Sequence, residues 1–106
     1  MGAFVIACYR PRPGQEAHLL EVVREHMPIL RSEGLVTDRA SCAMKAADGT
    51  IVEVFEWKSA QAVEQAHSNP NVLAMWGRFN ETCECISLSK LHETAQLFPH
   101  FEPVDV

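Results

Sequence analysis

The apolar positions in the first half of the chain follow two periods, which predict three strands and one helix. Residues 3–9 are apolar or small throughout, as in a strand buried on both faces. Residues 15–32 place leucine, valine and methionine at the spacing of one helical face. Alternation with period two follows in residues 36–44, and a third, largely apolar strand is predicted over residues 51–57. Aspartate followed by glycine in residues 47–50 is typical of a hairpin turn between these two strands.

The second half predicts a helix in two parts and a fourth strand. Ser59 is suited to cap a helix directly after the third strand. The Asn-Pro pair at 69–70 interrupts that helix, and a second helical segment with its own apolar face is expected from about Asn71. Alternation returns after Thr82 and predicts a strand that ends near Leu91.

Three residues modify these elements. Pro28 lies within the first helix, where proline removes a backbone donor, so we expect a kink or an early end there. Gly34 is placed to cap the carboxyl end of that helix. Asp38 interrupts the apolar row of the second strand, where an ionised carboxylate is costly unless it is paired.

The order βαββαβ predicts an α+β, ferredoxin-like fold, with a four-stranded antiparallel sheet and both helices on one face. The first and third strands are close to continuously apolar, so the face without helices requires a partner. We therefore expect a homodimer formed through the sheet face. The domain is predicted to cover residues 1–92, and residues 93–106 have apolar anchors without a period, as expected of a tail that docks.

Composition limits the class of protein. With 106 residues, 47% hydrophobic and 22% charged, the chain fits one compact domain. The net charge of -5 and the absence of Lys or Arg clusters argue against nucleic acid and against anionic membranes as partners. No apolar segment has the roughly 20 residues that span a bilayer, and no basic region precedes the first apolar run, so a cytoplasmic location is expected.

The cysteines predict free thiols. Cys8, Cys42, Cys83 and Cys85 lack the spacing of a disulfide framework. Cys83 and Cys85 are separated by one residue, whereas paired zinc ligands usually have two to four between them. No metal is expected.

Several short motifs resemble one known family. They are Arg-Pro-Gly-Gln at 12–15, Glu-Gly-Leu at 33–35, Phe-Glu-Trp-Lys-Ser-Ala-Gln-Ala at 55–62 and His-Ser-Asn-Pro at 67–70. With them the chain resembles the antibiotic biosynthesis monooxygenase (ABM)-like family, the dimeric α+β barrel group, over nearly its whole length except the tail. That family includes cofactor-independent monooxygenases, haem-degrading enzymes, small-molecule isomerases and proteins with no known activity.

The resemblance does not extend to haem chemistry. The haem-degrading branch uses an asparagine on the first strand, a tryptophan in the second helical region and a histidine ligand beyond it. The corresponding positions of this chain are Ala7, Ala66 and Trp76. No cofactor is therefore expected.

Two residues are candidates for proton transfer. His67 matches a histidine at the end of the first part of the second helix in many family members. It is either a half-buried residue that helps to end the helix or a pocket residue that moves a proton or hydrogen-bonds a substrate carbonyl. Asp38 is either paired with Arg10 or Arg39 or is a candidate base.

Aromatic residues are candidates for a substrate-binding wall. Each also has a structural interpretation, since aromatic residues at strand ends and on helical stripes most often belong to a core or an interface. The candidates are Tyr9, Phe55, Trp57, Trp76 and Phe79.

The preferred function is a cofactor-independent monooxygenase that acts on a small phenolic or quinone-like molecule. In that chemistry the deprotonated substrate itself donates an electron to oxygen, so the protein needs only to bind, orient and deprotonate it. The alternative is a non-catalytic dimeric module that binds a small ligand or assists a pathway enzyme. Polar groups converging in a closed pocket would favour the enzyme, and a pocket filled by Trp57, Trp76 and Phe79 would favour the module.

Overall fold

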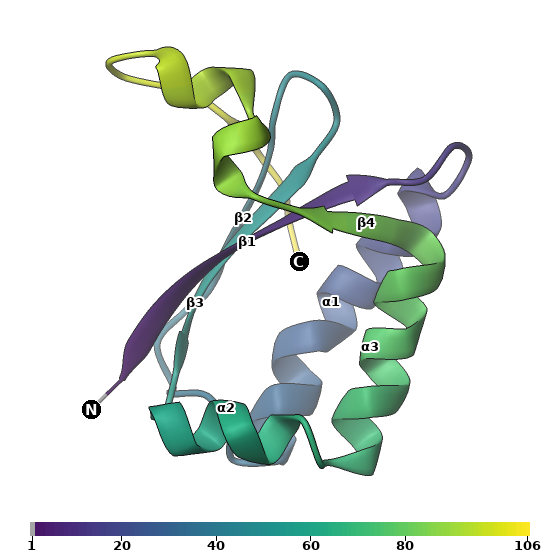
Figure 1. The fold of residues 1–106 in the computed structure, drawn as a ribbon, viewed down its shortest axis with the longest axis vertical. Coiled ribbons are helices and arrows are strands. Elements are labelled where there is room, and N and C mark those ends of the chain that lie inside the picture. Colours follow the sequence, from purple (N-terminus) through teal and green to yellow (C-terminus); the bar gives the residue numbers. More distant parts are fainter. Residues whose placement is uncertain (1) are drawn as a thin grey trace.

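The computed structural model describes residues 2–106 and has the predicted order βαββαβ, with short elements added at its carboxyl end. Figure 1 shows the elements in chain order. Their bounds are β1 (Ala3–Pro11), α1 (Glu16–Ser32), β2 (Cys42–Lys45), β3 (Ile51–Trp57), α2 (Ala60–Ala66), α3 (Pro70–Thr82), β4 (Cys83–Ile86) and β5 (Glu102–Pro103), with 3-10 turns η1 (Leu88–Lys90) and η2 (His92–Ala95).

The strands form one antiparallel sheet in the order β4-β1-β3-β2-β5. In the register of the central pair, Ala7 lies opposite Glu53 and Tyr9 lies opposite Ile51. On its other edge β1 pairs with β4, which places Cys85 opposite Tyr9. The first four strands have the arrangement predicted for a ferredoxin-like α+β fold, which is confirmed, and the two-residue β5 extends the sheet beyond β2.

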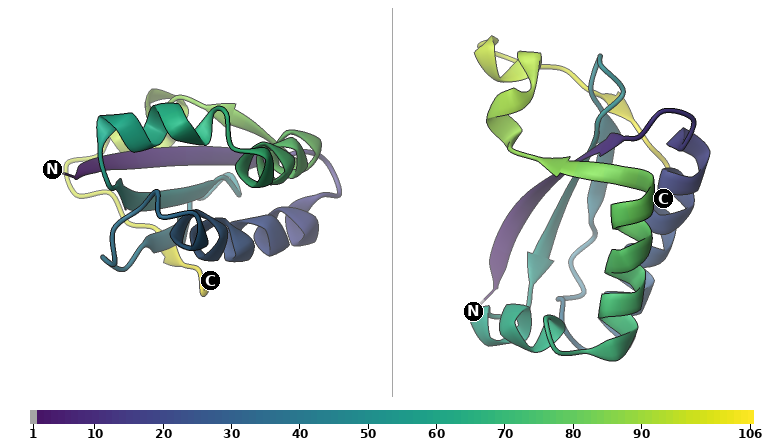
Figure 2. Two further views of the ribbon diagram at one scale, coloured as in Figure 1. Left: turned by 90° about the horizontal axis from the view of Figure 1, so that it is seen from below. Right: turned by 45° about the vertical axis from the view of Figure 1, so that its right-hand side comes forward.

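Helices α1 and α3 lie side by side and cover one face of the sheet, here called the inner face (Figures 1 and 2). The main core forms between this face and the helices, because alternate residues of β1 and β3 point toward the apolar stripes of α1 and α3. Its buried members include Tyr9, Leu19, Val23, Leu30, Ile51, Phe55, Trp57, Val72, Met75 and Phe79.

The helix ends follow the signals in the sequence. Gly34 has a φ of 70°, its N–H donates to the carbonyl of Arg31, and the N–H of Leu35 donates to that of Leu30. This pair of bonds is a Schellman motif, for which glycine is the preferred residue. The Ser59 hydroxyl accepts from the backbone N–H of Ala62 at 3.0 Å and begins α2 as predicted.

The second strand is shorter than its alternation predicts. The strand covers only Cys42–Lys45, and residues 37–41 are irregular, with a bend at 38–39. Val36 still bridges to Trp57, and the Thr37 N–H donates to the Glu56 carbonyl. Glu56 Oε1 accepts hydrogen bonds from Thr37 Oγ1 at 2.8 Å and from Arg39 Nε at 2.9 Å, and these side-chain bonds hold the bend against β3. Asp38 is exposed in this bend, so it does not interrupt a buried row.

Helix α1 ends at Ser32, as the spacing over residues 15–32 predicts, and does not end early at Pro28, because Met27 and Leu30 remain in the core on either side of the proline. One further expectation about an element end is wrong. Strand β4 ends at Ile86 and not near Leu91, since Ser87 caps the 3-10 turn that follows.

The opposite face of the sheet, here called the outer face, is covered at one end only. There the segment after β4 folds back over the sheet (Figure 1) and buries a second cluster of Cys8, Ala46, Val52 and Leu91. Phe4 and Ile6, also on the outer face, are 61% and 49% exposed. An apolar strip at the amino end of β1 is therefore open to solvent.

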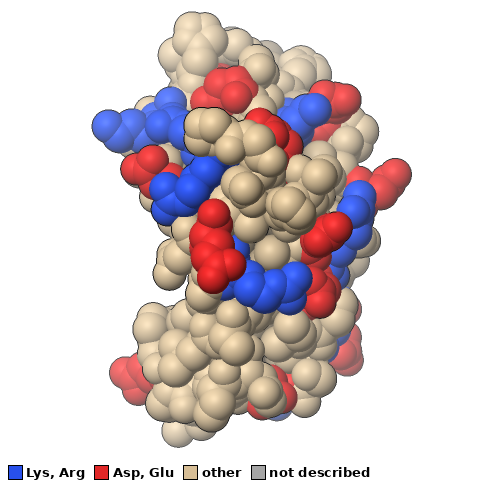
Figure 3. Space-filling view, turned by 90° about the vertical axis from the view of Figure 1, so that its right-hand side faces the viewer, with Lys and Arg blue, Asp and Glu red and all other residues tan. Residues whose placement is uncertain are grey.

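The charged surface carries no large patch of one sign on the face drawn in Figure 3, where acidic and basic side chains are interspersed. Several of these groups form exposed ion pairs, such as Arg78 of α3 with Glu25 of α1. Among residues 2–106, no helix combines the length and the hydropathy that crossing a bilayer demands.

Candidate functional site

A pocket of about 340 Å³ opens between the inner face of the sheet and helices α1 and α3. Its walls are mainly apolar, and its polar groups come from β1, α1, α3 and β4. The lining residues are Val5, Ala7, Tyr9, His26, Phe55, Trp57, Trp76, Phe79, Asn80 and Cys85.

All five residues predicted as a substrate-binding wall line this pocket. Phe55 and Trp57 come from β3, with ring centroids 5.4 Å apart. Tyr9 of β1 packs on Phe79 of α3 at 4.7 Å, and Trp76 lies one turn before Phe79. The rings leave an open space between them, and pockets of this size and character commonly hold small ligands.

A buried polar cluster lies beside this wall. His26 Nδ1 is 2.6 Å from Glu53 Oε1, and the Tyr9 hydroxyl donates to the same oxygen at 2.8 Å. His26 is 3% exposed and Glu53 is fully buried. Burial and the Glu53 carboxylate beside it raise the pKa of the Tyr9 hydroxyl, which therefore stays protonated and acts as a donor.

The Glu53 carboxylate is incompletely satisfied. Both of its donors bond Oε1, and Oε2 is buried without a partner among the described residues. Within residues 2–106 His26 is the basic side chain that pairs with it, and no lysine or arginine does. A buried carboxylate of this kind is uncommon unless it has a function or holds an unseen donor such as water.

Two neighbouring thiols complete the polar side of the pocket. Cys83 and Cys85 are two residues apart on β4, so both point to the inner face, with Cys83 buried and Cys85 exposed. A hydrogen bond from the Cys83 thiol, with a smaller contribution from the nearby His26 ring, lowers the pKa of Cys85 to about 6. The same hydrogen bond and burial raise the pKa of Cys83.

We predict that iodoacetamide alkylates Cys85 before the exposed Cys42. An ordinary thiol, with a pKa of about 8.5, is mostly protonated at a pH of about 7, whereas Cys85 is mostly ionised there. This larger thiolate fraction outweighs the lower intrinsic nucleophilicity of a thiolate with a lower pKa, so the rate at Cys85 should be about two- to threefold higher. Mass spectrometry of timed digests measures both sites in one sample. Cys83→Ala removes the hydrogen-bond donor to Cys85 and should slow the alkylation of Cys85 at this pH. Equal rates for Cys85 and Cys42 would contradict the prediction.

The two residues predicted for proton transfer lie elsewhere. His67 ends α2, is exposed, and its Nδ1 lies 2.8 Å from the carbonyl of Val63. Its ring packs edge-on against Trp76 at 5.0 Å, behind the pocket wall. Asp38 lies in the bend before β2, also outside the lining. His67 therefore contacts one residue of the aromatic wall, Trp76, but neither His67 nor Asp38 lines the pocket.

His26 and Glu53 are not among the residues predicted from the sequence, although the position of each within its element indicates that it faces the core. Glu53 occupies the same alternating positions as Ile51, Phe55 and Trp57, all on the inner face. His26 lies between Val22 and Leu30 on the buried stripe of α1. A carboxylate and an imidazole at core positions of two packed elements require partners, and here they are partners of one another.

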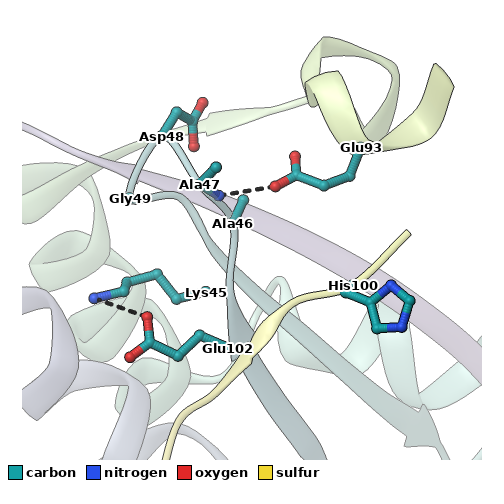
Figure 4. A pocket seen from close by; sticks show the side chains of 8 residues that line it. All are labelled: Lys45, Ala46, Ala47, Asp48, Gly49, Glu93, His100 and Glu102. Carbon is teal, nitrogen blue, oxygen red and sulfur yellow. Dashed lines mark hydrogen bonds and ion pairs between the residues drawn. The ribbon is translucent and has the colours of Figure 1, made fainter. Parts of the chain in front are cut away.

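A second hollow, of about 490 Å³, lies between the β2–β3 hairpin and the segment after β4 (Figure 4). Its polar groups bond one another. Glu93 Oε2 accepts from the backbone N–H of Ala47 at 2.8 Å, and Lys45 Nζ is 3.6 Å from Glu102 Oε2. These bonds attach the carboxyl segment to the sheet. Among residues 2–106, no cluster of three metal-ligating side chains is present here or elsewhere.

We predict that Glu93→Ala destabilises this attachment. The buried carboxylate satisfies the Ala47 N–H, and its loss leaves that donor unpaired at a cost of about 1–3 kcal/mol. Glu102→Ala, which removes an exposed ion pair in the same hollow, should change stability little. Urea denaturation compares the two variants. Equal effects would mean that the Glu93 bond does not hold the segment.

The comparisons with known proteins agree with the observed fold, and the family match includes most of the elements that line the pocket. The profile of the family described as antibiotic biosynthesis monooxygenase (ABM) matches residues 3–77, which include β1, α1, β2, β3 and α2. The chain therefore belongs to the antibiotic biosynthesis monooxygenase family. No curated protein matches the chain.

A solved structure, that of Rv0793 from Mycobacterium tuberculosis, has the same fold. The match has a TM-score of 0.63 and 20% sequence identity, and it covers 82% of this chain and 94% of that one. At this identity the likeness concerns the fold.

Proposed function

We propose that this protein is a cofactor-independent monooxygenase that acts on a small phenolic or quinone-like molecule bound between the sheet and helices α1 and α3. The observation that carries the proposal is the pocket lined by Phe55, Trp57, Trp76 and Phe79, with polar groups of Tyr9, His26 and Cys85 at its edge. A flat apolar ring fits such walls, and a hydroxyl group would face the polar edge. Membership of the family supports the reaction class.

The proposed oxygenation requires little from the protein besides this binding pocket. An electron-rich phenol, once it has lost its proton, can donate an electron to oxygen directly. Binding it in a dry, shaped site orients the ring and excludes water from the reactive intermediate. The aromatic wall would perform both tasks.

A screen of phenols and quinones tests the proposal. Ligands that occupy the pocket should raise the melting temperature, since binding to the native state stabilises it by mass action. The same ligands should consume oxygen when they are incubated with the protein. Stabilisation without oxygen uptake would favour the non-catalytic binding module, and a panel without any stabilising ligand would contradict the pocket assignment.

We also propose that the protein is a homodimer paired through its outer sheet face. The support is the exposed strip of Phe4 and Ile6, which the carboxyl segment leaves uncovered. In a two-fold symmetric dimer the same patch of each protomer packs against its copy, so both patches are removed from water. Light scattering of the wild type should give twice the chain mass.

The variant Ile6→Glu tests this interface. It should give a monomer, because a charge would then be buried at the centre of the paired face. Leu73→Glu on α3 is the matched control, since Leu73 is similarly exposed, at 46%, but belongs to a different face. A monomeric wild type, or dimers of both variants, would contradict the proposed interface.

A further inference from the structure

The polar cluster at the pocket edge is arranged as a proton acceptor, His26, whose ring is oriented by a second group, Glu53. His26 Nδ1 is engaged by Glu53 Oε1 at 2.6 Å. In the neutral ring the shared proton then belongs to Nδ1, which leaves the lone pair on Nε2. Within residues 2–106 no group hydrogen-bonds Nε2, and the ring lines the pocket.

The His26 ring is also fixed in place. It packs edge-on against Phe55 at 5.2 Å and Phe79 at 5.0 Å, and Tyr9 lies at 6.5 Å. Because Tyr9 donates to the same Glu53 oxygen, the carboxylate is held as well. A base that is oriented before the ligand arrives loses little entropy when the ligand binds.

We propose that His26 Nε2 accepts the proton of a phenolic hydroxyl bound in the pocket, and that Glu53 orients the ring and stabilises the resulting imidazolium. This inference rests on the proposed function and names the group that deprotonates the ligand. Here His26 is the catalytic residue and Glu53 is a positioning residue.

The step is balanced in atoms and charge. The ligand O–H bond breaks and an N–H bond forms at Nε2, so the ligand becomes a phenolate and the ring becomes an imidazolium. The imidazolium lies between two negative groups, the phenolate and Glu53. The buried carboxylate, which no lysine or arginine neutralises, thereby gains a full counter-charge.

The ligand class follows from these contacts. One weakly acidic hydroxyl must reach Nε2, while the flat apolar body lies against Trp57, Trp76 and Phe79. The site suits small monocyclic or bicyclic phenols. Cys85, which lines the same pocket, is the competing acceptor that the experiment has to separate from His26.

The test uses 4-nitrophenol, whose phenolate absorbs visible light and whose neutral form does not. The probe is added below its own pKa, calorimetry measures binding, and absorbance measures the ionised fraction of the bound probe. In the wild type we expect the phenolate band to grow saturably with binding. His26→Gln should abolish the band, and Glu53→Gln should lower the ratio of bound phenolate to bound phenol about tenfold or more, the usual effect of removing an opposite charge in contact.

His18→Gln is the control, since it makes the same change at an exposed position of α1 and should leave the band as in the wild type. Cys85→Ala tests the competing acceptor, because a phenolate band that remains without the thiol cannot arise from proton transfer to Cys85. Loss of the band in Cys85→Ala together with its persistence in His26→Gln would assign the proton to the thiol and overturn the proposal.

The outcomes separate this inference from the proposed function. Calorimetric binding with the probe still neutral in the wild type would overturn the role of His26 but leave the pocket assignment intact. Absence of binding by any phenol would overturn both. If His26→Gln fails to fold, ¹⁵N spectra of the wild type decide, since both ring nitrogens of His26 should carry protons in the complex and only one in the free protein.

Discussion

Replacing His26 by alanine is expected to lower the free energy of unfolding by about 3–5 kcal/mol, the usual cost of leaving a buried charge without its partner. His26 is 3% exposed and pairs with the fully buried Glu53. Without the ring, the carboxylate keeps only the Tyr9 hydroxyl as a donor and faces a void. For a domain of this size the loss is a large part of the total stability.

The double variant His26→Ala, Glu53→Met distinguishes the cost of an unpaired charge from the cost of lost packing. It removes the carboxylate together with its partner, so it should be more stable than His26→Ala alone, because no unpaired charge remains. His18→Ala, at an exposed position of the same helix, is the control and should change little. Urea denaturation followed by circular dichroism measures all three. A double variant less stable than His26→Ala would contradict the account of Glu53.

Phe79→Ala is expected to cost about 3–5 kcal/mol, the range for removing a buried aromatic side chain. Phe79 is buried and contacts both Tyr9 and His26, so its loss enlarges the pocket and frees the ring of His26. Leu73→Ala on the exposed side of α3 should have a small effect. Thermal and urea denaturation compare the two variants.

The enlarged pocket provides a second readout. A bicyclic phenol should bind Phe79→Ala more tightly than the wild type and restore part of its lost stability, since it fills the space left by the ring. A small effect of Phe79→Ala on stability, with unchanged ligand preference, would show that Phe79 does not form the wall of the ligand site.

The order of the elements could be predicted because each has a local cause. Gly34 ends α1 and Ser59 begins α2 through bonds within a few residues of chain. The bend at 38–39 could not be predicted in this way. It depends on Glu56, which is distant in sequence and lies on the neighbouring strand, bonding Thr37 and Arg39.

The candidate site was only partly predictable for a similar reason. The aromatic residues were singled out as individual members of strands and helices, and the fold brings Tyr9, Phe55, Trp57, Trp76 and Phe79 to one pocket. His67 was favoured because its neighbours determine where a helix ends. That local signal gives the position of His67 along the chain, but it does not show on which side of Trp76 the imidazole packs.

The pair of His26 and Glu53 shows what a reading by periods overlooks. Glu53 lies in a strand that is otherwise largely apolar, and His26 lies in an amphipathic helix, so the periods of the two elements indicate no partner for either residue. Their partnership spans 27 residues and joins α1 to β3, so it emerges only when the two elements pack. A rule that flags every ionisable residue on a predicted inner face would have found both.

The most direct test of the proposed function is isotope labelling. A phenol that binds the pocket is incubated with the protein under ¹⁸O₂ without an added cofactor, and the product mass is measured. The account predicts a product that carries oxygen from ¹⁸O₂, formed by the wild type and lost in His26→Gln. A bound phenol that is recovered unoxidised, or a product whose added oxygen comes from water, would contradict it.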